Sequence, residues 1–424
     1  CTKAMTATAI ALLVDEHKMS WDDSVRKHVP FFRLSDPLAD RDVTLRDLLC
    51  HRTGLSRHEY LWYRAPWSLE QTVRRVGHVE LTHSFRSRYE YNNIAYITLG
   101  LAIGSASEMP WNEFVQKRLF TPLGMTGVVF SRSAALKAPD HASAHALSAT
   151  GKVEVIPWYD DDKQVRASGS VKAGVRDLSR WLRFQLNDGE WEGKQLVSRA
   201  ALLETRRPQI VTPILEPLET EVDTTQSSYG LGWRIHDYRG HLLVLHGGSV
   251  DGFRSRITLV PKEKLGVVVL ANLAVSEMPA SLSSSLVDLM LGLKKKDWNR
   301  IGNELHKKEE ASEKNRVKAW RATRQPGTKP SRELQAYTGA YEHRGYGTAT
   351  VSLEGDALLL AWSSWRLKLE HFHYDTFATP PPGRLGNQPA TFTLGPDGTP
   401  SRLRFLGQEF RRTKRAADTE DAPR

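Results

Sequence analysis

A histidine followed by two glycines, His246-Gly247-Gly248, is the stretch whose residue types first suggest chemistry. A glycine pair removes side-chain bulk where a ligand or another backbone must come close, and here it follows an apolar run without closing an obvious hairpin. The pattern predicts that His246 stands at a strand end, beside a backbone edge that a substrate can reach. From this segment alone, a turn capped by a histidine is an equally good interpretation.

The runs around this histidine predict an antiparallel meander. Short β-rich runs bounded by Gly and Pro are typical of buried strands, and the connection at 261–264 has hairpin length. A further strand is expected at 229–235. The runs of the meander itself are 242–245, 254–260 and 265–272.

Helices are expected before and after the meander. Residues 2–17 are apolar on nearly all faces, which predicts a buried helix. Thr44 fits an N-cap with Asp47 three residues later, and the glycine of 51–55 is expected to end that helix. The other predicted helices are 69–79, 93–105, 111–119, 177–187, 198–205 and 279–293.

The C-terminal part of the sequence has a different pattern. Residues 294–330 are charged and low in apolar residues, which predicts an exposed helix or tether. From residue 334 short apolar runs separated by turns predict a small antiparallel sheet or barrel. The predicted strands are 337–341, 349–353, 357–362, 366–372, 391–394 and 403–406. The expected organisation is a first domain at 1–293, a linker at 294–330, a β domain at 331–415 and a disordered tail at 416–424.

Composition narrows the class of protein. The 424 residues, 40% hydrophobic and 25% charged, are typical of a globular protein of two domains. The net charge of +10 is spread along the chain, which favours solvated faces over a nucleic-acid groove. Nothing approaches a membrane span of about 20 apolar residues. Cys1 and Cys50 form no disulfide framework or metal-ligand spacing, which favours a reducing compartment, and no cofactor or metal is expected. Localisation and oligomeric state stay open.

Three stretches stand in a fixed order: Cys1-Thr2-Lys3 at the head of the first helix, Tyr91-Asn92-Asn93 after a polar loop, and His246-Gly247-Gly248. In that order they resemble the serine β-lactamase and penicillin-binding-protein superfamily, in the branch of class C β-lactamases, D-aminopeptidases and related esterases. That superfamily uses S-x-x-K, then Y-x-N or S-x-N, then K-T-G or a variant such as H-x-G.

Further stretches are similar to recurring patterns of that superfamily: 43–55, 168–171 with 177–182, and Tyr229-Gly230-Leu231-Gly232-Trp233. The resemblance covers about residues 1–293. Residues 331–413 resemble, more weakly, the lipocalin-like β domain appended to some members. The fold implied is α+β, an α/β sandwich with an antiparallel sheet flanked by helices and a helical subdomain, followed by a small all-β barrel.

The resemblance also implies roles for particular residues. Lys3 would be the base, which requires a pKa well below about 10.4. Tyr91 would share or shuttle a proton with this lysine, and Asn93 would hydrogen-bond the substrate or the lysine. His246 would take the place of the lysine of the third motif, lining the pocket and orienting the substrate or a proton relay.

The backbone around the third motif would bind the substrate. Gly247 and Gly248 would let the substrate lie along the strand, and the Ser249 N–H would supply one oxyanion-hole donor beside that of the nucleophile. Three other histidines, His51, His371 and His373, are expected to be structural or solvated.

Each role has a plainer alternative. Lys3 in isolation fits an exposed lysine at a helix start, Tyr91 fits a core aromatic, and His246 fits a non-catalytic pocket histidine. Cys1 as an N-terminal nucleophile is chemically conceivable, but the rest of the chain does not resemble that kind of fold.

One departure from the family pattern matters for function. The S-x-x-K spacing places the serine immediately before Cys1, outside this sequence, so we expect an N-terminally truncated member. The first hypothesis is a serine hydrolase that cleaves an ester, amide or β-lactam bond of a small molecule or peptide. The second is an inactive fragment or pseudoenzyme scaffold that binds a peptide or small ligand. The third is carbohydrate or peptide binding through the C-terminal β domain, which predicts that residues 331–415 alone retain the ligand. Histidine at 246 favours esterase or peptidase chemistry over β-lactam hydrolysis.

Overall fold

The computed structural model describes residues 1–148, 150–214 and 222–413. The chain divides into two compact units, one made of residues 1–59 and 68–308, the other of residues 60–67 and the chain from 309 onward. The grouping of the short segment 60–67 with the C-terminal part has no signal in the sequence. The domain boundaries at 293 and 331 remain predictions, and the predicted disordered tail at 416–424 lies outside the described residues.

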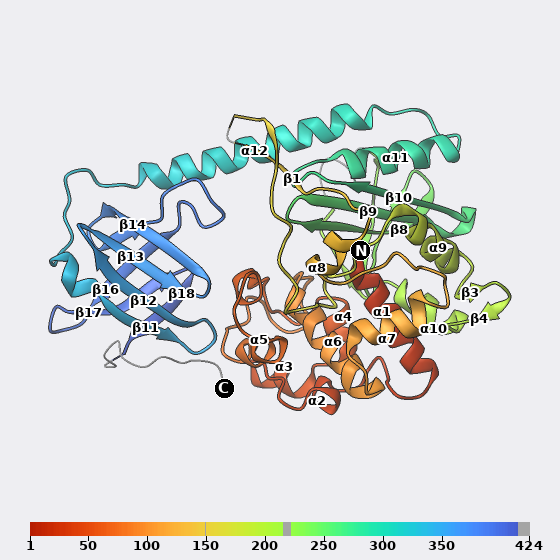
Figure 1. The fold of residues 1–424 in the computed structure, drawn as a ribbon, viewed down its shortest axis with the longest axis horizontal. Helices are drawn as coiled ribbons and strands as arrows, with labels where there is room; N and C mark the ends of the chain where they lie inside the picture. The colour runs from red at the N-terminus through yellow and green to blue at the C-terminus, as the bar shows by residue number, and fades with distance from the viewer. Residues whose placement is uncertain (149, 215–221, 414–424) are drawn as a thin grey trace. The chain divides into compact units, whose positions relative to one another are not determined.

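A six-stranded antiparallel sheet forms the centre of the first unit (Figure 1). Its strand order is β10-β9-β8-β7-β6-β5, so consecutive strands are neighbours throughout. The predicted β8–β9–β10 meander is therefore present. The strands are β5 (Ile210–Val211), β6 (Ser227–Tyr229), β7 (Arg234–Tyr238), β8 (His241–Val250), β9 (Phe253–Val260) and β10 (Leu265–Ala271).

Two strand predictions were wrong. The predicted strand 229–235 is two strands, β6 and β7, because the chain turns between them at Gly232, where φ is +84°. His246 does not stand at a strand end: β8 continues through both glycines to Val250, because β9 pairs with it without interruption up to that residue.

The first unit also contains helices on both sides of this sheet, and the predicted helices are present with shifted ends. The helices of the chain are α1 (Thr2–Asp15), α2 (Val25–His28), α3 (Pro37–Asp42), α4 (Leu45–Leu49), α5 (Leu69–Val76), α6 (Asn93–Ser107), α7 (Trp111–Val115), α8 (Arg132–Lys137), α9 (Val175–Leu186), α10 (Arg199–Thr205), α11 (Met278–Met290) and α12 (Trp298–Ala322). The glycine stop predicted for α4 was wrong. The helix ends at Leu49, whereas Gly54, with φ +82°, lies so close to a neighbouring loop that a Cβ would stand 2.1 Å from the His83 carbonyl oxygen.

Helices cover both faces of the sheet, as the sandwich prediction requires. Gly266 of β10 faces α9, because a Cβ there would touch Leu182. The next residue, Val267, faces the opposite side, where it joins a core cluster with Val287 of α11. α1 lies on the α9 side, since Gln185 of α9 donates a hydrogen bond to Thr8 of α1. The helices α2–α7 form the expected helical subdomain beside the sheet (Figure 1).

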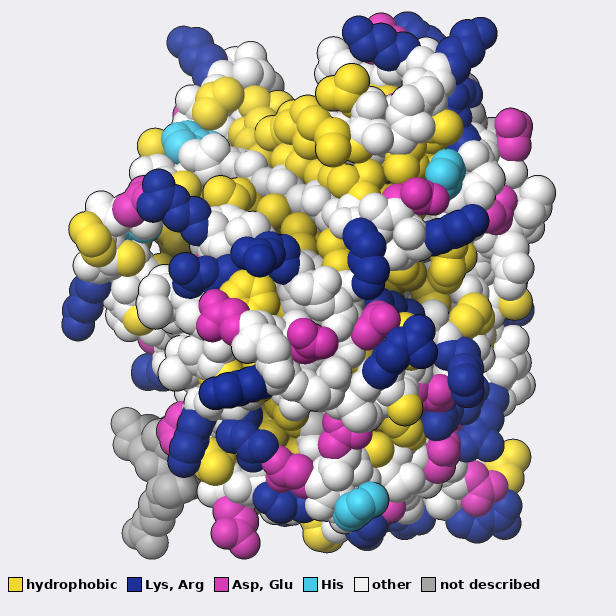
Figure 2. Space-filling model, turned by 90° about the vertical axis from the view of Figure 1, so that its right-hand side faces the viewer, with side chains coloured by type: hydrophobic (Ala, Val, Ile, Leu, Met, Phe, Trp, Pro, Cys, Tyr) yellow, Lys and Arg dark blue, Asp and Glu magenta, His cyan; other side chains and the backbone are white. Residues whose placement is uncertain are grey.

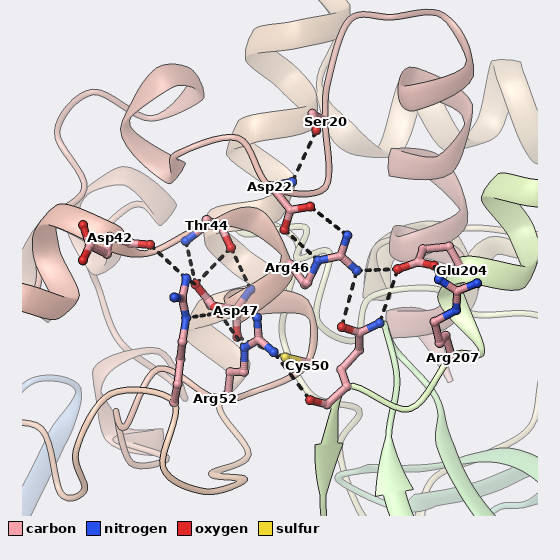
Figure 3. Close-up of polar contacts among 12 residues, drawn as sticks. Ser20, Asp22, Asp42, Thr44, Arg46, Asp47, Cys50, Arg52, Glu204 and Arg207 are labelled. Atoms are coloured by element: carbon pink, nitrogen blue, oxygen red, sulfur yellow. Dashed lines mark hydrogen bonds and ion pairs between the residues drawn. The ribbon is translucent and has the colours of Figure 1, made fainter.

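A buried carboxylate ties two loops of this helical subdomain to α4 (Figure 3). Thr44 caps the helix by accepting from the Asp47 N–H, and the Asp47 side chain accepts in return from the Thr44 N–H, which is the predicted capping box. Asp47 also accepts from Arg52 and from Arg86, at 2.5 and 2.7 Å. Burial opposes ionisation, but the hydrogen bonds from Arg86 and Arg52 outweigh it and lower the pKa of Asp47.

The second unit contains a closed eight-stranded barrel in which each strand pairs with the next and the last pairs with the first. This up-and-down closure leaves no free sheet edge and confirms the predicted barrel. Two strands had not been predicted, β15 and β18. The strands are β11 (Gly339–His343), β12 (Gly347–Glu354), β13 (Ala357–Trp362), β14 (Trp365–His373), β15 (Thr376–Ala378), β16 (Pro389–Leu394), β17 (Pro400–Phe405) and β18 (Gln408–Arg412).

Aromatic side chains fill much of the barrel and also fix the segment 60–67 to it. Tyr341 and Phe392 are among the buried rings, and their centroids lie 5.6 Å apart. The Tyr63 ring stacks on Trp365 at 6.4 Å. The Ser364 hydroxyl donates to the Arg64 carbonyl at 2.6 Å, so this segment is a structural part of the second unit.

Charged side chains of both signs are interspersed over the face of the molecule in Figure 2. This distribution agrees with the expectation that the net charge of +10 is spread along the chain. Across the described residues, no helix is long and apolar enough to cross a membrane. Neither does this part of the chain contain a cluster of three or more His, Cys, Asp or Glu side chains arranged to hold a metal ion.

We expect the Asp47→Asn substitution to lower the free energy of unfolding by about 3 kcal/mol, because it leaves two arginines without their buried counter-charge. Asp22→Asn is the matched control. Asp22 also accepts two hydrogen bonds from one arginine, Arg46, but its side chain is 63% exposed, whereas that of Asp47 is 0% exposed. The control should cost less than about 1 kcal/mol. Urea unfolding followed by circular dichroism measures both, and equal losses would contradict a structural role specific to Asp47.

Candidate active site

Lys3 stands in the first turn of α1 with its side chain buried. Its Nζ donates to Asn93 Oδ1 at 2.7 Å and to the Ser168 carbonyl oxygen at 2.9 Å. The same nitrogen lies over the ring of Tyr91, 4.7 Å from the centroid. Three segments that are far apart in the sequence therefore converge on one amine.

The environment of Lys3 favours the neutral amine. Burial lowers the pKa of Lys3 to about 7, the positive charge of Arg57 adds to this effect, and Glu59 acts in the opposite direction. A neutral amine has two N–H bonds and one lone pair, and the two acceptors at Asn93 and Ser168 satisfy both N–H bonds. Lys3 can therefore present a lone pair near neutral pH, which is the state that a general base needs.

Tyr91 and Asn93 are positioned by the N-terminus of α6. Asn92 caps this helix, since its side chain accepts from the Ala95 N–H at 2.9 Å, and its own N–H donates to Nδ1 of His51 at 3.2 Å. Burial raises the pKa of Tyr91, so its phenol keeps its proton at neutral pH. The structure brings Tyr91 to Lys3 through the face of its ring. Proton exchange between the two remains a prediction.

His246 reaches the same cluster of side chains from β8 and is buried. Its ring centroid lies 6.4 Å from that of Tyr91. Burial first, and then positive charge that includes Lys3, lowers the pKa of His246 well below its usual value, so the imidazole is neutral. The structure thus places the predicted residues Lys3, Tyr91 and His246 around one space.

The glycines after His246 lie where β8 has one open edge. The ladder with β7 ends at Leu245, whereas the ladder with β9 continues to Val250. The backbone nitrogen of Cys1 approaches this edge and donates to the Gly247 carbonyl at 3.3 Å. Ser249 is exposed on the same half of the strand, and its role as an oxyanion donor remains a prediction.

Gly247 and Gly248 differ in the space that a side chain would have at each position. A Cβ at Gly248 would stand 2.2 Å from the Ser255 hydroxyl, whereas at Gly247 the nearest atom would be 3.9 Å away. A side chain at Gly248 would therefore have to displace the Ser255 hydroxyl of β9, whereas one at Gly247 would meet no close neighbour. The sequence pattern could not separate these two surroundings.

Several residues around the site had no predicted role there. Tyr229 is buried, and its hydroxyl lies 3.0 Å from Nε2 of His246. His51 is buried against the rings of Tyr91 and Tyr96, with centroids 4.5 and 5.2 Å away. Gly232 packs on the backbone of Lys3, where a Cβ would lie 2.8 Å from the carbonyl oxygen. The family-like pattern Tyr-Gly-Leu-Gly-Trp at 229–233 was the only sequence signal for Tyr229 and Gly232.

Comparison with known protein families shows to which family the chain belongs. The model of the family described as Beta-lactamase matches residues 1–290. The chain belongs to the Beta-lactamase family. A second model, a domain of unknown function named DUF3471, matches residues 323–420, the part of the chain that contains the barrel.

Curated relatives of this Beta-lactamase family protein include a fungal hydrolase and a bacterial protein. Unguisins hydrolase ungD' of Aspergillus campestris is 27% identical over 434 residues, which covers 96% of this chain and 79% of the relative. Protein flp of Staphylococcus aureus is 28% identical over 281 residues, which covers 66% of this chain and 53% of that protein.

Solved structures share the fold. The octameric penicillin-binding protein homologue from Pyrococcus abyssi has a TM-score of 0.59 at 22% identity, over 97% of this chain and 86% of that one. The D-stereospecific amidohydrolase from Streptomyces has a TM-score of 0.53 at 22% identity, over 64% of this chain and 80% of that one. The predicted fold class is thereby confirmed.

Membership makes this chain part of a β-lactamase-fold serine hydrolase family. The cluster of Lys3, Tyr91 and His246 is its candidate active site. The placement in the class C branch and the truncation remain predictions.

We expect the Gly232→Ala substitution to disturb this site, because the new Cβ would collide with the backbone of Lys3 and force α1 to move. Gly240→Ala is the matched control, since Gly240 has nearly the same φ, +86° against +84°, but no heavy atom within 4 Å of a Cβ. The control should lose about 1 kcal/mol from backbone strain alone, and Gly232→Ala about 1–3 kcal/mol more from overpacking. Urea unfolding of the two variants separates these contributions. Equal losses would contradict the close packing on Lys3.

Proposed function

We propose that this chain carries the acyl-transfer site of a serine hydrolase that cleaves an amide or ester bond through an acyl-enzyme, with Lys3 as the base. One observation carries the proposal: a buried amine with a pKa of about 7, held by Asn93 and the Ser168 carbonyl at the head of α1. The nucleophile of this proposal is a serine immediately before Cys1. In an S-x-x-K helix, serine and lysine share one face, so their side chains meet.

The proposed acylation uses the residues in the following way. Nζ of Lys3 takes the proton of the serine hydroxyl while the serine oxygen attacks the carbonyl carbon of the substrate. Tyr91, which keeps its proton at neutral pH, delivers a proton toward the leaving group. The N–H groups of Ser249 and of the serine itself bind the developing oxyanion.

The third motif, which begins at His246, favours substrates without a charged group next to the scissile bond. His246 is a buried neutral imidazole, so it offers no fixed positive charge to a substrate carboxylate. Among the relatives, one is named a hydrolase of unguisins and another a D-stereospecific amidohydrolase. These names support amides of peptide type as the first substrates to test, ahead of β-lactams.

The test uses a protein that contains residues 1–424 together with the segment encoded directly upstream of Cys1. We expect it to react with a fluorophosphonate probe and to hydrolyse p-nitrophenyl acetate and amino-acid p-nitroanilides. Lys3→Met should lower kcat by about 10²–10⁴-fold, the usual worth of a general base. The control is Lys152→Met, because Lys152 is exposed. Full turnover without Lys3 would contradict the assignment of the base, and absence of both labelling and turnover would favour a non-catalytic scaffold.

We also expect a specific pH dependence. A base acts when it is unprotonated, so kcat/KM should rise with pH through about 7, the pKa of Lys3, and level off above it. Arg57→Gln removes a positive charge that lowers the pKa of Lys3, and Glu59 remains, so the midpoint should move to higher pH. Arg74→Gln, an exposed arginine on α5, is the control and should leave the midpoint in place. An unchanged or lowered midpoint in Arg57→Gln would contradict the role of Lys3.

A further inference from the structure

The segment 161–172 lies against the first two turns of α1 and offers two neighbouring carbonyl oxygens to it. The Ser168 carbonyl accepts from Nζ of Lys3 at 2.9 Å, and the Ala167 carbonyl accepts from the Thr6 hydroxyl at 2.8 Å. The segment contains no helix and no strand. Its backbone therefore needs contacts other than those of regular secondary structure to keep these oxygens in place.

A buried ion pair joins the two ends of this segment. Nζ of Lys172 donates to Oδ2 of Asp161 at 2.6 Å, and the two side chains are 18% and 5% exposed. The same nitrogen donates to the Phe130 carbonyl at 3.0 Å and to the Ser170 carbonyl at 3.4 Å, so three acceptors satisfy the three N–H bonds of an ammonium group. The ends of the segment therefore cannot separate without leaving a buried charge unpaired.

A glycine of α6 brings the two acceptors of Lys3 together. Asn93, the first residue of α6, provides one of them, and Gly100 lies about two turns later on the same face of that helix. A Cβ at Gly100 would stand 2.9 Å from the Cβ of Ala167. Ala167 has no flexible side chain that could move aside, so the two elements approach this closely because residue 100 is glycine. This contact sets the separation between the elements that carry Asn93 and Ser168.

A cavity of about 510 Å³ borders the same contact, and its lining includes Ile97, Gly100, Val165 and Ala167. An empty space offers no atoms for the segment to pack against. Packing on this side therefore does not prevent the segment from shifting away from α1. The hydrogen bonds to α1 and the ion pair at the ends of the segment have to fix the position of the Ser168 carbonyl.

We propose that Gly100, Asp161 and Lys172 are positioning residues that hold the Ser168 carbonyl at the amine of Lys3. Their importance for catalysis rests on the proposed function. Without this carbonyl, a neutral amine has one acceptor and can rotate, so its lone pair no longer points in one direction. A displaced segment also lets water reach Nζ.

The segment 161–172 acts on Lys3 through its position and not through its charges. Burial is the largest cause of the lowered pKa of Lys3, and the charges that shift it are those of Arg57 and Glu59. The other ionisable groups around this amine also come from outside the segment: Cys1, His51, Tyr91, Tyr96 and His246. A change in the pKa of Lys3 after substitution within the segment therefore reports movement of the segment.

The pKa of Lys3 can be measured on the chain of residues 1–424 itself. NMR titration of protein labelled at the lysine Cε atoms gives this pKa, and Lys3→Met identifies the signal by its loss. In Gly100→Ala the segment must move, and water that reaches Nζ hydrates the ammonium form. We therefore expect the pKa of Lys3 to rise from about 7 toward its ordinary value of about 10.4.

Gly104→Ala is the matched control for Gly100→Ala. Both glycines lie in α6, so both substitutions bring the same gain in helix propensity. A Cβ at Gly104 would have its nearest neighbour, the Met109 carbonyl oxygen, at 3.6 Å, which is an ordinary contact. We expect no change in the pKa of Lys3 in this control.

A second variant keeps the proposal testable if Gly100→Ala does not fold. The double variant Asp161→Asn/Lys172→Met removes the ion pair without leaving either charge unpaired, and we expect the same rise in the pKa of Lys3. Lys163→Met is its control, because Lys163 is exposed on the same segment. A pKa of Lys3 that stays near 7 or falls in these variants would overturn the proposal. A loss of stability alone would then show a purely structural role.

Kinetics of the longer protein separate this proposal from the proposed function. There Gly100→Ala should move the midpoint of kcat/KM to higher pH and lower its value at pH 7 by about tenfold, because a smaller fraction of Lys3 is unprotonated. Gly104→Ala should stay within about twofold of the unmodified protein. Absence of turnover in the unmodified longer protein would overturn the proposed function and leave the pKa result standing. An unshifted pH profile with normal turnover in Gly100→Ala would overturn only the present inference.

Discussion

The burial of one amine, Nζ of Lys3, is the constraint on which the rest of the candidate site depends. An ammonium group removed from water loses several kcal/mol of hydration. Among the described residues, Nζ has two hydrogen-bond acceptors, at Asn93 and Ser168. They satisfy a neutral amine but leave one hydrogen of an ammonium without a carbonyl or amide acceptor. The ring faces of Tyr91 and Tyr96 partly replace the missing partner. A pKa of about 7 expresses this near-balance between the two protonation states.

Such a position for Lys3 requires close packing around the head of α1. Gly232 touches the Lys3 carbonyl because it has no side chain, and the helix itself presents small residues such as Ala4 and Ala7 to its buried surroundings. On the other side of the pocket, the loop that contains His51 must hold Asn92 at the start of α6, so that Asn93 reaches the lysine. Asp47 stabilises that loop by forming ion pairs with Arg52 and Arg86. The chemistry of one nitrogen therefore depends on packing and ion pairs in several distant segments.

The features that the sequence predicted are those with strong local signals. The buried helix α1, the capping box at Thr44, the β8–β10 meander and most strands of the barrel follow from periodicity and turn residues, and the motif order pointed to the site that Lys3, Tyr91 and His246 share. Features that depend on long-range partners were missed. β8 continues through Gly247 and Gly248 only because β9 pairs with it, and β18 has a polar sequence but closes the barrel by pairing with β17 and β11. The contact between Tyr229 and His246 joins two strands that are not neighbours, so no local pattern could reveal it.

The same burial has opposite effects on the two groups that the family pattern pairs at this site. It lowers the pKa of Lys3, because the charged form of an amine is the protonated one, and it raises the pKa of Tyr91, because the charged form of a phenol is the deprotonated one. In the resting pocket, the proton therefore belongs on the tyrosine and the lone pair on the lysine. A tyrosinate base would have to exist against both burial and the neighbouring Tyr89, whose presence also raises the pKa of Tyr91. The electrostatics of this pocket thus favour lysine as the group that accepts the first proton, with the tyrosine able to pass on a proton that it already holds.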